Sequence, residues 1–186
     1  MVDADKQAQV YETGRIEGGF HAEGIMGCVY GSSHQFFVGD AGPDSASGGA
    51  SSSVEQMVGT LAAVATSSYE NYGQVQRDEV SVIELRTGRL MRHSATGPPE
   101  PAHDYESAGA GPVTSLVLRP NGDIAWIAAT PYQRLTSAGK DQVYTLEASG
   151  QRMVASGNEI DPLSLALADE TIYWTQAGKP DSAPLK

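Results

Sequence analysis

Short apolar runs separated by turn residues follow one another most clearly between Val113 and Val154. This part of the chain reads VTSLVLRPNGDIAWIAAT, then a loop, then DQVYTLEASGQRMV. Apolar runs of this length, bounded by Gly, Pro, Asn and Asp, are typical of β-strands. Asn121-Gly122 is a strong signal for a tight hairpin turn. The pattern therefore predicts two consecutive β-hairpins.

Much of this pattern occurs 63 positions earlier as well. The block TLAAVATS at 60–67 falls on DIAWIAAT at 123–130, and the segment that begins at Asp78 falls on the one that begins at Asp141. A third, partial occurrence follows, in which SLAL at 164–167 matches SLVL at 115–118. Because one offset of 63 holds over both hairpins, we interpret the two segments as structural repeats.

Each repeat reads as four short strands joined by tight turns. Repeated four-stranded antiparallel units are typical of β-propeller blades, which must stack because one sheet cannot bury both of its own faces. We therefore predict an all-β, β-propeller-like chain that forms a single domain over 1–186. Its expected parts are a partial blade at 7–40, a flexible loop at 41–53, blades at 54–94 and 113–156, and a partial blade at 163–186.

Trp126 and Trp174 recur at equivalent positions of the repeat. Recurrence in a repeat favours packing between sheets over an exposed binding role. We therefore expect both tryptophans to lie in the core between neighbouring sheets.

Some weaker features concern the ends of the chain. The polar residues 1–6 are expected to be frayed, the first strand to lie at 8–11, and residues 14–23 to form a loop or an irregular hairpin. Lys179-Pro180 reads as a loop, with a further short edge strand at 182–185.

The resulting count is about three and a half blades, whereas closed propellers have roughly four to eight. The two terminal half-blades could join into one sheet and close a small ring. Two chains could instead combine their blades, or an open arc of sheets could pack against another chain or be capped by loops. An uncovered sheet edge promotes association, so the chain is expected to form a homo-oligomer or to bind another protein.

A resemblance to known proteins supports the same fold. The hairpins VSVIELRTGRL and VYTLEASGQRM, and the run DPLSLALADETIYWTQAGKPDSAPL, resemble propeller repeats of uncharacterised actinobacterial secreted proteins. The resemblance covers most of residues 75–186 and implies a propeller-like fold and an extracellular location. It implies no catalytic residues.

Composition excludes some classes of function. The chain has 12 Lys and Arg against 23 Asp and Glu, a net charge of −11, which disfavours binding to nucleic acid. Cys28 is the single cysteine, so no disulfide can form within the chain; we expect a buried thiol, with a bridge to another chain as the alternative.

The sequence predicts neither a targeting segment nor a membrane span. MVDADKQAQV lacks the features of a signal peptide, and no apolar run approaches the roughly 20 residues of a membrane span. A mature extracellular form is expected from the resemblance, and a cytoplasmic protein is the alternative.

Chemistry-bearing patterns are sparse. No histidine pair has the spacing of a metal site, no serine or cysteine has the context of a nucleophile, and no cofactor-binding loop is present. We therefore predict no catalytic residue, no metal and no cofactor. The best candidates for a binding face are aromatic and polar residues of the expected long loops, namely Tyr69, Tyr72, His103, Tyr105 and Tyr132.

The sequence is compatible with three functions. The first is a non-enzymatic extracellular binding or assembly module that self-associates. The second is an extracellular structural protein that polymerises into filaments or rings. The third is a propeller hydrolase or lyase acting on a glycan or a small molecule, with Asp40, Asp78, Glu106 and Asp141 as candidate carboxylates.

Overall fold

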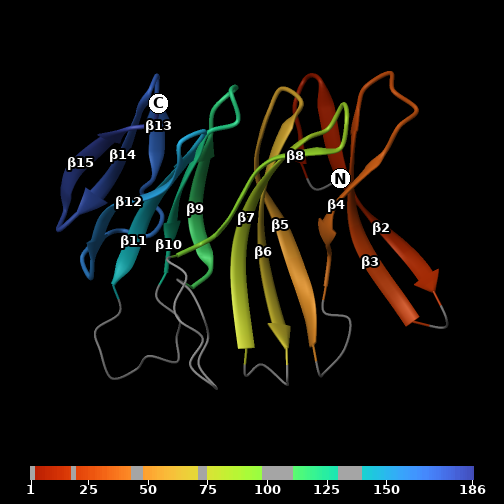
Figure 1. Ribbon diagram of the computed structural model, residues 1–186, viewed down its shortest axis with the longest axis horizontal. Coiled ribbons are helices and arrows are strands. Elements are labelled where there is room, and N and C mark those ends of the chain that lie inside the picture. Colours follow the sequence, from red (N-terminus) through yellow and green to blue (C-terminus); the bar gives the residue numbers. More distant parts are fainter. Residues whose placement is uncertain (1–2, 18–19, 43–47, 71–74, 98–110, 130–139) are drawn as a thin grey trace.

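The structure is a computed structural model of the whole chain, and it describes all residues except 1–2, 18–19, 43–47, 71–74, 98–110 and 130–139. The described residues contain β-strands and no helix, which confirms the predicted all-β class. The strands form four antiparallel sheets that follow one another along the chain. Figure 1 shows these sheets side by side, from the N-terminal sheet in red to the C-terminal sheet in blue.

The first sheet has four strands, so it is more complete than the predicted partial blade at 7–40. Its strands, in the order β1-β2-β3-β4, are β1 (Asp3–Ala4), β2 (Ala8–Glu17), β3 (Phe20–Val29) and β4 (Phe36–Asp40). The prediction of frayed residues was wrong for Asp3 and Ala4, which pair with Val10 and Gln9. The prediction of a loop or an irregular hairpin at 14–23 was also wrong, because β2 and β3 pair in unbroken register over all ten residues of each.

The second sheet has the order β5-β6-β7-β8 and corrects the predicted flexible loop at 41–53. Its strands are β5 (Gly48–Val58), β6 (Leu61–Glu70), β7 (Val75–Glu84) and β8 (Arg89–Ala95). Residues 48–53 belong to β5 and pair with β6, where the Ser52 and Thr66 hydroxyls are 2.9 Å apart. Small side chains have a packing reason here, because a Cβ added at Gly39 would lie 2.5 Å from Ser52. The Ser-rich run thus lets β4 and β5 approach closely.

The third sheet has the order β12-β11-β10-β9. Its strands are β9 (Val113–Leu118), β10 (Ile124–Ala128), β11 (Asp141–Glu147) and β12 (Gly150–Gly157). The turn between β9 and β10 contains Gly122 at a φ of 87°, a left-handed conformation that favours glycine. The expected Asn-Gly hairpin turn is therefore present.

The fourth sheet has three strands in the order β13-β14-β15. They are β13 (Ala166–Ala168), β14 (Thr171–Gln176) and β15 (Lys179–Pro184). The prediction of a loop at Lys179-Pro180 was wrong, because β15 begins there and pairs with the end of β14. Proline is tolerated in β15 because this strand is an edge of its sheet and needs no donor on its outer side.

Three apolar clusters hold the four sheets together, one between each successive pair. Val10 and Ile25 of the first sheet meet Val64 of the second, and Val80 of the second meets Trp126 of the third. Trp174 of the fourth sheet packs on the third, so both tryptophans lie in cores as predicted, with 0% and 3% of their surface exposed. Among the described residues no cluster joins the fourth sheet to the first, so the arrangement is open.

The two full repeats do not superimpose with the constant offset of 63, because structurally equivalent residues of β6 and β10 are one residue closer in sequence. Ala62 pairs with Ile83 and both face the first sheet, whereas Ile124 pairs with Leu146 and both face the second sheet. Ile83 and Leu146 are 63 residues apart, but Ala62 and Ile124 are 62 apart. Leu61, the sequence match of Ile124, faces the third sheet instead. Side chains alternate between the faces of a sheet, so one residue of shift reverses the direction of every side chain in a strand.

Candidate functional site

The predicted binding face can be located for one residue only. Tyr69 lies near the end of β6, paired with Gly49 and Gln76, and its side chain is partly buried. The prediction that Tyr69 belongs to a loop was wrong, because β6 and β7 continue beyond the expected loop boundary. Tyr72, His103, Tyr105 and Tyr132 lie outside the described residues, so their predicted binding role stays a prediction.

The candidate carboxylates of the hydrolase hypothesis lie on separate sheets. Asp40 ends β4 of the first sheet, Asp78 belongs to β7 of the second, and Asp141 begins β11 of the third, while Glu106 lies outside the described residues. Asp78 is buried and accepts a hydrogen bond from the Ser67 hydroxyl. In the described part of the chain, no three His, Cys, Asp or Glu side chains gather closely enough to hold a metal ion.

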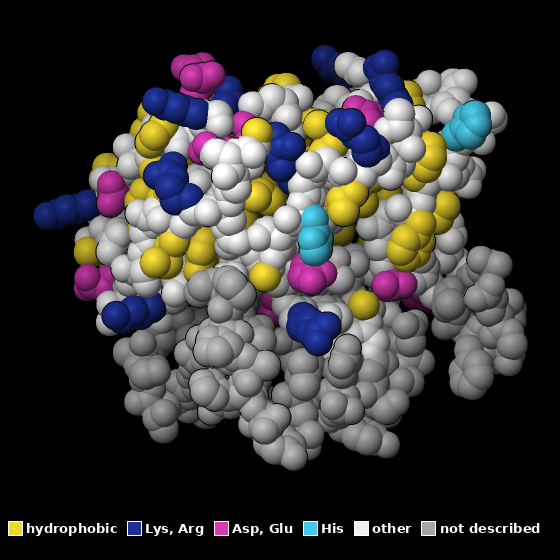
Figure 2. All heavy atoms as spheres, viewed as in Figure 1, with side chains coloured by type: hydrophobic (Ala, Val, Ile, Leu, Met, Phe, Trp, Pro, Cys, Tyr) yellow, Lys and Arg dark blue, Asp and Glu magenta, His cyan; other side chains and the backbone are white. Residues whose placement is uncertain are grey.

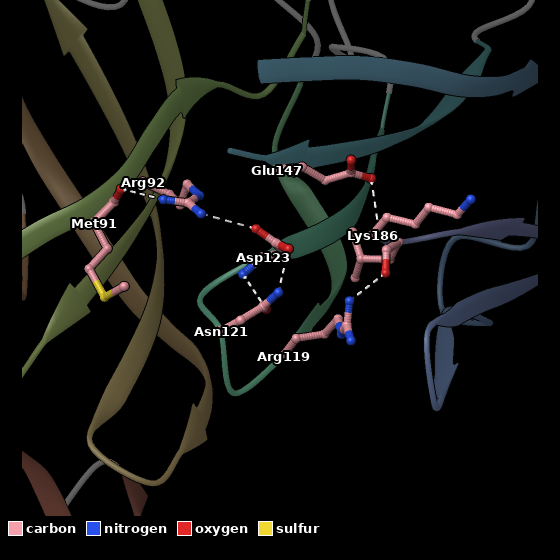
Figure 3. A network of polar contacts seen from close by, with 8 residues as sticks. Met91, Arg92, Arg119, Asn121, Asp123, Glu147 and Lys186 are labelled. Atoms are coloured by element: carbon pink, nitrogen blue, oxygen red, sulfur yellow. Dashed lines mark hydrogen bonds and ion pairs between the residues drawn. The ribbon is translucent and has the colours of Figure 1, made fainter. Parts of the chain in front are cut away.

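A polar network joins three of the sheets at the end where their short turns lie (Figure 3). Its centre is Asp123, of which the side chain is 4% exposed. One carboxylate oxygen of Asp123 lies 3.1 Å from the Arg92 guanidinium of the second sheet, and the other accepts a bond of 2.6 Å from the Asn121 amide. Both oxygens are thus engaged, so the arrangement holds sheets in place rather than offering a free base.

The same network continues to the fourth sheet. The Arg119 guanidinium donates to the Leu185 carbonyl at 2.6 Å and to the Glu170 carboxylate at 2.9 Å, and the Lys186 backbone N–H donates to Glu147 at 3.2 Å. Figure 2 shows Lys and Arg side chains mostly over the upper half of the viewed face. Arg92 and Arg119 are paired with acids, so these two basic groups contribute to holding the sheets together.

The outer face of the first sheet carries exposed apolar side chains in the described structure. Val10 and Ile25 point toward the second sheet, so their neighbours Tyr11 and Met26 point outward. Phe37 pairs with Met26 across β3 and β4, and Met26 pairs with Tyr11 across β2 and β3. These three residues form a row across the sheet, in which Phe37 is 59% exposed.

Two further residues extend this face toward the short turns. Cys28 points outward two positions after Met26, and its sulfur accepts a weak contact of 3.6 Å from the Gln9 amide. Tyr30 follows at the same spacing and is 50% exposed. Burial raises the pKa of the Tyr11 hydroxyl, and the nearby Cys28 thiol adds to the rise. Cys28 is buried within its own chain, as predicted. We call this surface the first-sheet face; it consists of Gln9, Tyr11, Met26, Cys28, Tyr30 and Phe37.

The opposite end of the molecule has a different surface. The outward positions of the fourth sheet alternate with Ile172 and Trp174, which point toward the third sheet. They carry small or polar side chains, except for Tyr173 at 42% exposure. We call this surface the fourth-sheet face; it consists of Ala166, Ala168, Thr171, Tyr173, Thr175 and Ser182.

Sequence reasoning missed the first-sheet face, although the sequence contained a signal for it. The run Ile25-Met26-Gly27-Cys28-Val29-Tyr30 is apolar at both odd and even positions. A strand of this kind has two apolar faces, and a strand in a terminal sheet can bury only one of them inside its own chain. The search for aromatic residues in loops passed over these strand positions.

Comparisons with known proteins add no family to this description. No family model, no curated protein and no solved structure matches the chain. Among the described residues, no helix is long and apolar enough to cross a membrane.

Proposed function

We propose that the chain is a non-enzymatic assembly module, built on a β-propeller-like scaffold, that associates with itself. The observation that carries this proposal is the first-sheet face, where Phe37 and Tyr30 keep 59% and 50% of their surface exposed. Large apolar side chains that gather on one sheet face are typical of interaction surfaces. Aromatic residues and methionine are also enriched in protein interfaces.

The propeller-like part of the proposal is supported by the order of contacts. Each sheet packs face to face on the next one along the chain, which is how propeller blades bury their surfaces. Strands β5 and β9, each the first of its sheet, also contact one another. The open end of such an arc leaves apolar surface that another chain covers.

The non-enzymatic part is supported by the polar groups at hand. Asp123 is fully hydrogen-bonded in the interior, and the described candidate carboxylates lie on three different sheets. Asp78 is buried and accepts a hydrogen bond from Ser67, so this carboxylate is engaged within its own sheet. The extracellular location that the resemblance implies stays a prediction.

The experiment that tests self-association is a measurement of native mass by light scattering over a wide range of protein concentrations. We expect the average native mass to exceed that of one chain and to increase as the protein concentration rises. A mass of one chain at every concentration would remove the proposal.

A further inference from the structure

Two of the three junctions between sheets follow one rule of side-chain size. At these two, the preceding sheet contributes mostly smaller aliphatic residues and the following sheet contributes mostly larger ones. Between the second and third sheets, Ala63, Val80 and Val82 meet Trp126 and Tyr144. Between the third and fourth sheets, Ala125 and Val143 lie in one cluster with Ile172 and Trp174.

The junction between the first and second sheets is balanced in side-chain size. Small and large aliphatic residues come from both sides of this cluster, namely Ala8, Val10, Ile25 and Val38 from the first sheet and Met57, Ala62, Val64, Ile83 and Leu85 from the second. Close packing requires that bulky side chains on one face meet small ones on the other, because both sheets are held at about 10 Å. The rule therefore gives the third sheet a direction, with a bulkier face toward its predecessor and a smaller-residue face toward its successor.

The two uncovered end faces fit this rule as a matching pair. The first-sheet face, on which no described sheet packs, is bulky, with Tyr11, Met26 and Phe37 in one row. The fourth-sheet face, which is likewise uncovered among the described residues, consists mainly of small residues such as Ala166 and Ala168. The first-sheet face therefore has the properties that a sheet following the fourth would have.

We propose that two chains close a ring of eight sheets, in which the first-sheet face of each chain packs on the fourth-sheet face of the other. This inference rests on the proposed self-association. Two chains of four sheets each give eight sheets, which lies within the roughly four to eight blades of known propellers. A ring with two such contacts is closed and has two-fold symmetry, so it does not grow into a filament.

Charge and edge structure favour the same partner. The residues that define the two end faces include no Lys, Arg, Asp or Glu, although the chain carries a net charge of −11; Arg15, Glu17 and Asp40 occupy outward register positions further along β2 and β4. Two copies with such a charge approach with least repulsion where neither surface is charged. Edge-to-edge pairing is disfavoured, because the edge strand β15 contains Pro180 and Pro184 and the edge strand β1 has only two residues.

The test places one charge in each end face and measures the native mass by light scattering. The variants are Phe37→Asp in the first-sheet face and Ala166→Asp in the fourth-sheet face; both positions are exposed in the single chain. The control is Thr87→Asp, an exposed turn position that changes the net charge equally. Circular dichroism and thermal unfolding of each variant establish that the fold is kept.

We expect the native protein and Thr87→Asp to reach the mass of two chains and to remain there as the concentration rises. Phe37→Asp and Ala166→Asp should each weaken association by roughly 30-fold or more, because each substitution buries an unpaired charge at both contacts of the ring. A mixture of the two variants should regain part of the association, since it restores one unaltered contact.

Other outcomes separate this inference from the proposed function. If only Phe37→Asp loses association, two first-sheet faces meet each other, and the proposed ring is wrong. If only Ala166→Asp loses association, the proposed ring is also wrong. A native mass that rises above that of two chains would contradict a closed ring of two chains. Two chains that persist in both variants overturn the inference and leave self-association intact, whereas a native mass of one chain removes both proposals.

Discussion

Two junctions, one between the second and third sheets and one between the third and fourth, each contain a tryptophan at the same position of the repeat. They differ in whether the indole N–H is hydrogen-bonded. Trp126 donates its indole N–H to the Thr96 carbonyl at 2.9 Å and stacks on Tyr144, with ring centroids 5.4 Å apart. The buried indole nitrogen of Trp174 has no hydrogen-bond partner in the described part of the chain. The repeat thus places the ring, and the neighbouring connection determines whether its N–H is satisfied.

The difference arises from the segments that leave the preceding sheet. Thr96 directly follows β8 and remains beside the third sheet, where its hydroxyl donates to the Gly111 carbonyl at 3.1 Å. The segment that follows β12 instead pairs with the backbone of β14, through Ile160 and Gln176. In that segment the Glu159 carbonyl accepts from the Ala177 N–H at 2.9 Å, and no described acceptor bonds to the Trp174 indole.

Removal of the Trp126 ring is expected to have the largest effect on stability. Trp126→Ala is expected to lower the free energy of unfolding by about 3–5 kcal/mol, because a large buried side chain is lost from the central junction. Trp174→Ala should cost about 1 kcal/mol less, since no hydrogen bond is lost there. Urea unfolding of both variants measures the difference, and equal costs would show that the indole hydrogen bond contributes nothing.

The next largest difference in stability is expected between substitutions in the charged contacts of the two junctions. Asp123→Ala should cost about 2–4 kcal/mol, because it leaves the Arg92 guanidinium partly buried without its acid. Glu170→Gln at the next junction should cost less than about 0.5 kcal/mol, since the Glu170 side chain is 68% exposed. A cost for Asp123→Ala as small as that for Glu170→Gln in urea unfolding would contradict a structural role for the network.

A milder substitution isolates the indole N–H itself. Trp126→Phe removes a satisfied buried donor, whereas Trp174→Phe removes an unsatisfied one, and both replace the indole by a smaller ring. We expect Trp126→Phe to be more destabilising by about 1 kcal/mol. The two variants serve as controls for each other in thermal unfolding, and the reverse order of stability would contradict the hydrogen-bond assignment.

The smallest effect concerns alkaline pH. Burial against Trp126 raises the pKa of Tyr144 to about 12 from its ordinary value of 10.0. The neutral phenol is therefore favoured in the fold, and its contribution to stability is fully present below pH 10 and is lost as the pH rises toward 12. Tyr144→Phe should remove this part of the pH dependence. Thermal unfolding measured between pH 9 and pH 12 checks it, and an unchanged slope in the variant would contradict the assignment.

Much of the local structure could be predicted because its causes are local. Turn residues such as Asn121-Gly122 and short apolar runs indicate hairpins wherever they occur. The prediction failed at 48–53 and 14–23, where polar or Gly-rich segments form strands by pairing along a neighbouring strand. Their own side chains do not favour that conformation, so no pattern within those segments indicates it.

The candidate binding surface was missed for a related reason. Tyr11, Met26 and Phe37 form a row only through the pairing of β2, β3 and β4. They are separated by 15 and 11 residues along the chain, so composition in a window does not connect them. The search of expected loops led instead to Tyr69, which lies in a strand.

The sequence by itself determined the class of the fold, the repeated hairpins and the burial of Trp126 and Trp174, because these follow from turn chemistry and from apolar recurrence. Only the tertiary structure decided which face of each strand is covered. Leu61 and Ile124 match in sequence but point in opposite directions along the row of sheets. Side chains alternate between the two faces of a strand. A register shift of one residue therefore leaves the composition of the strand unchanged but moves every side chain to the opposite face of the sheet.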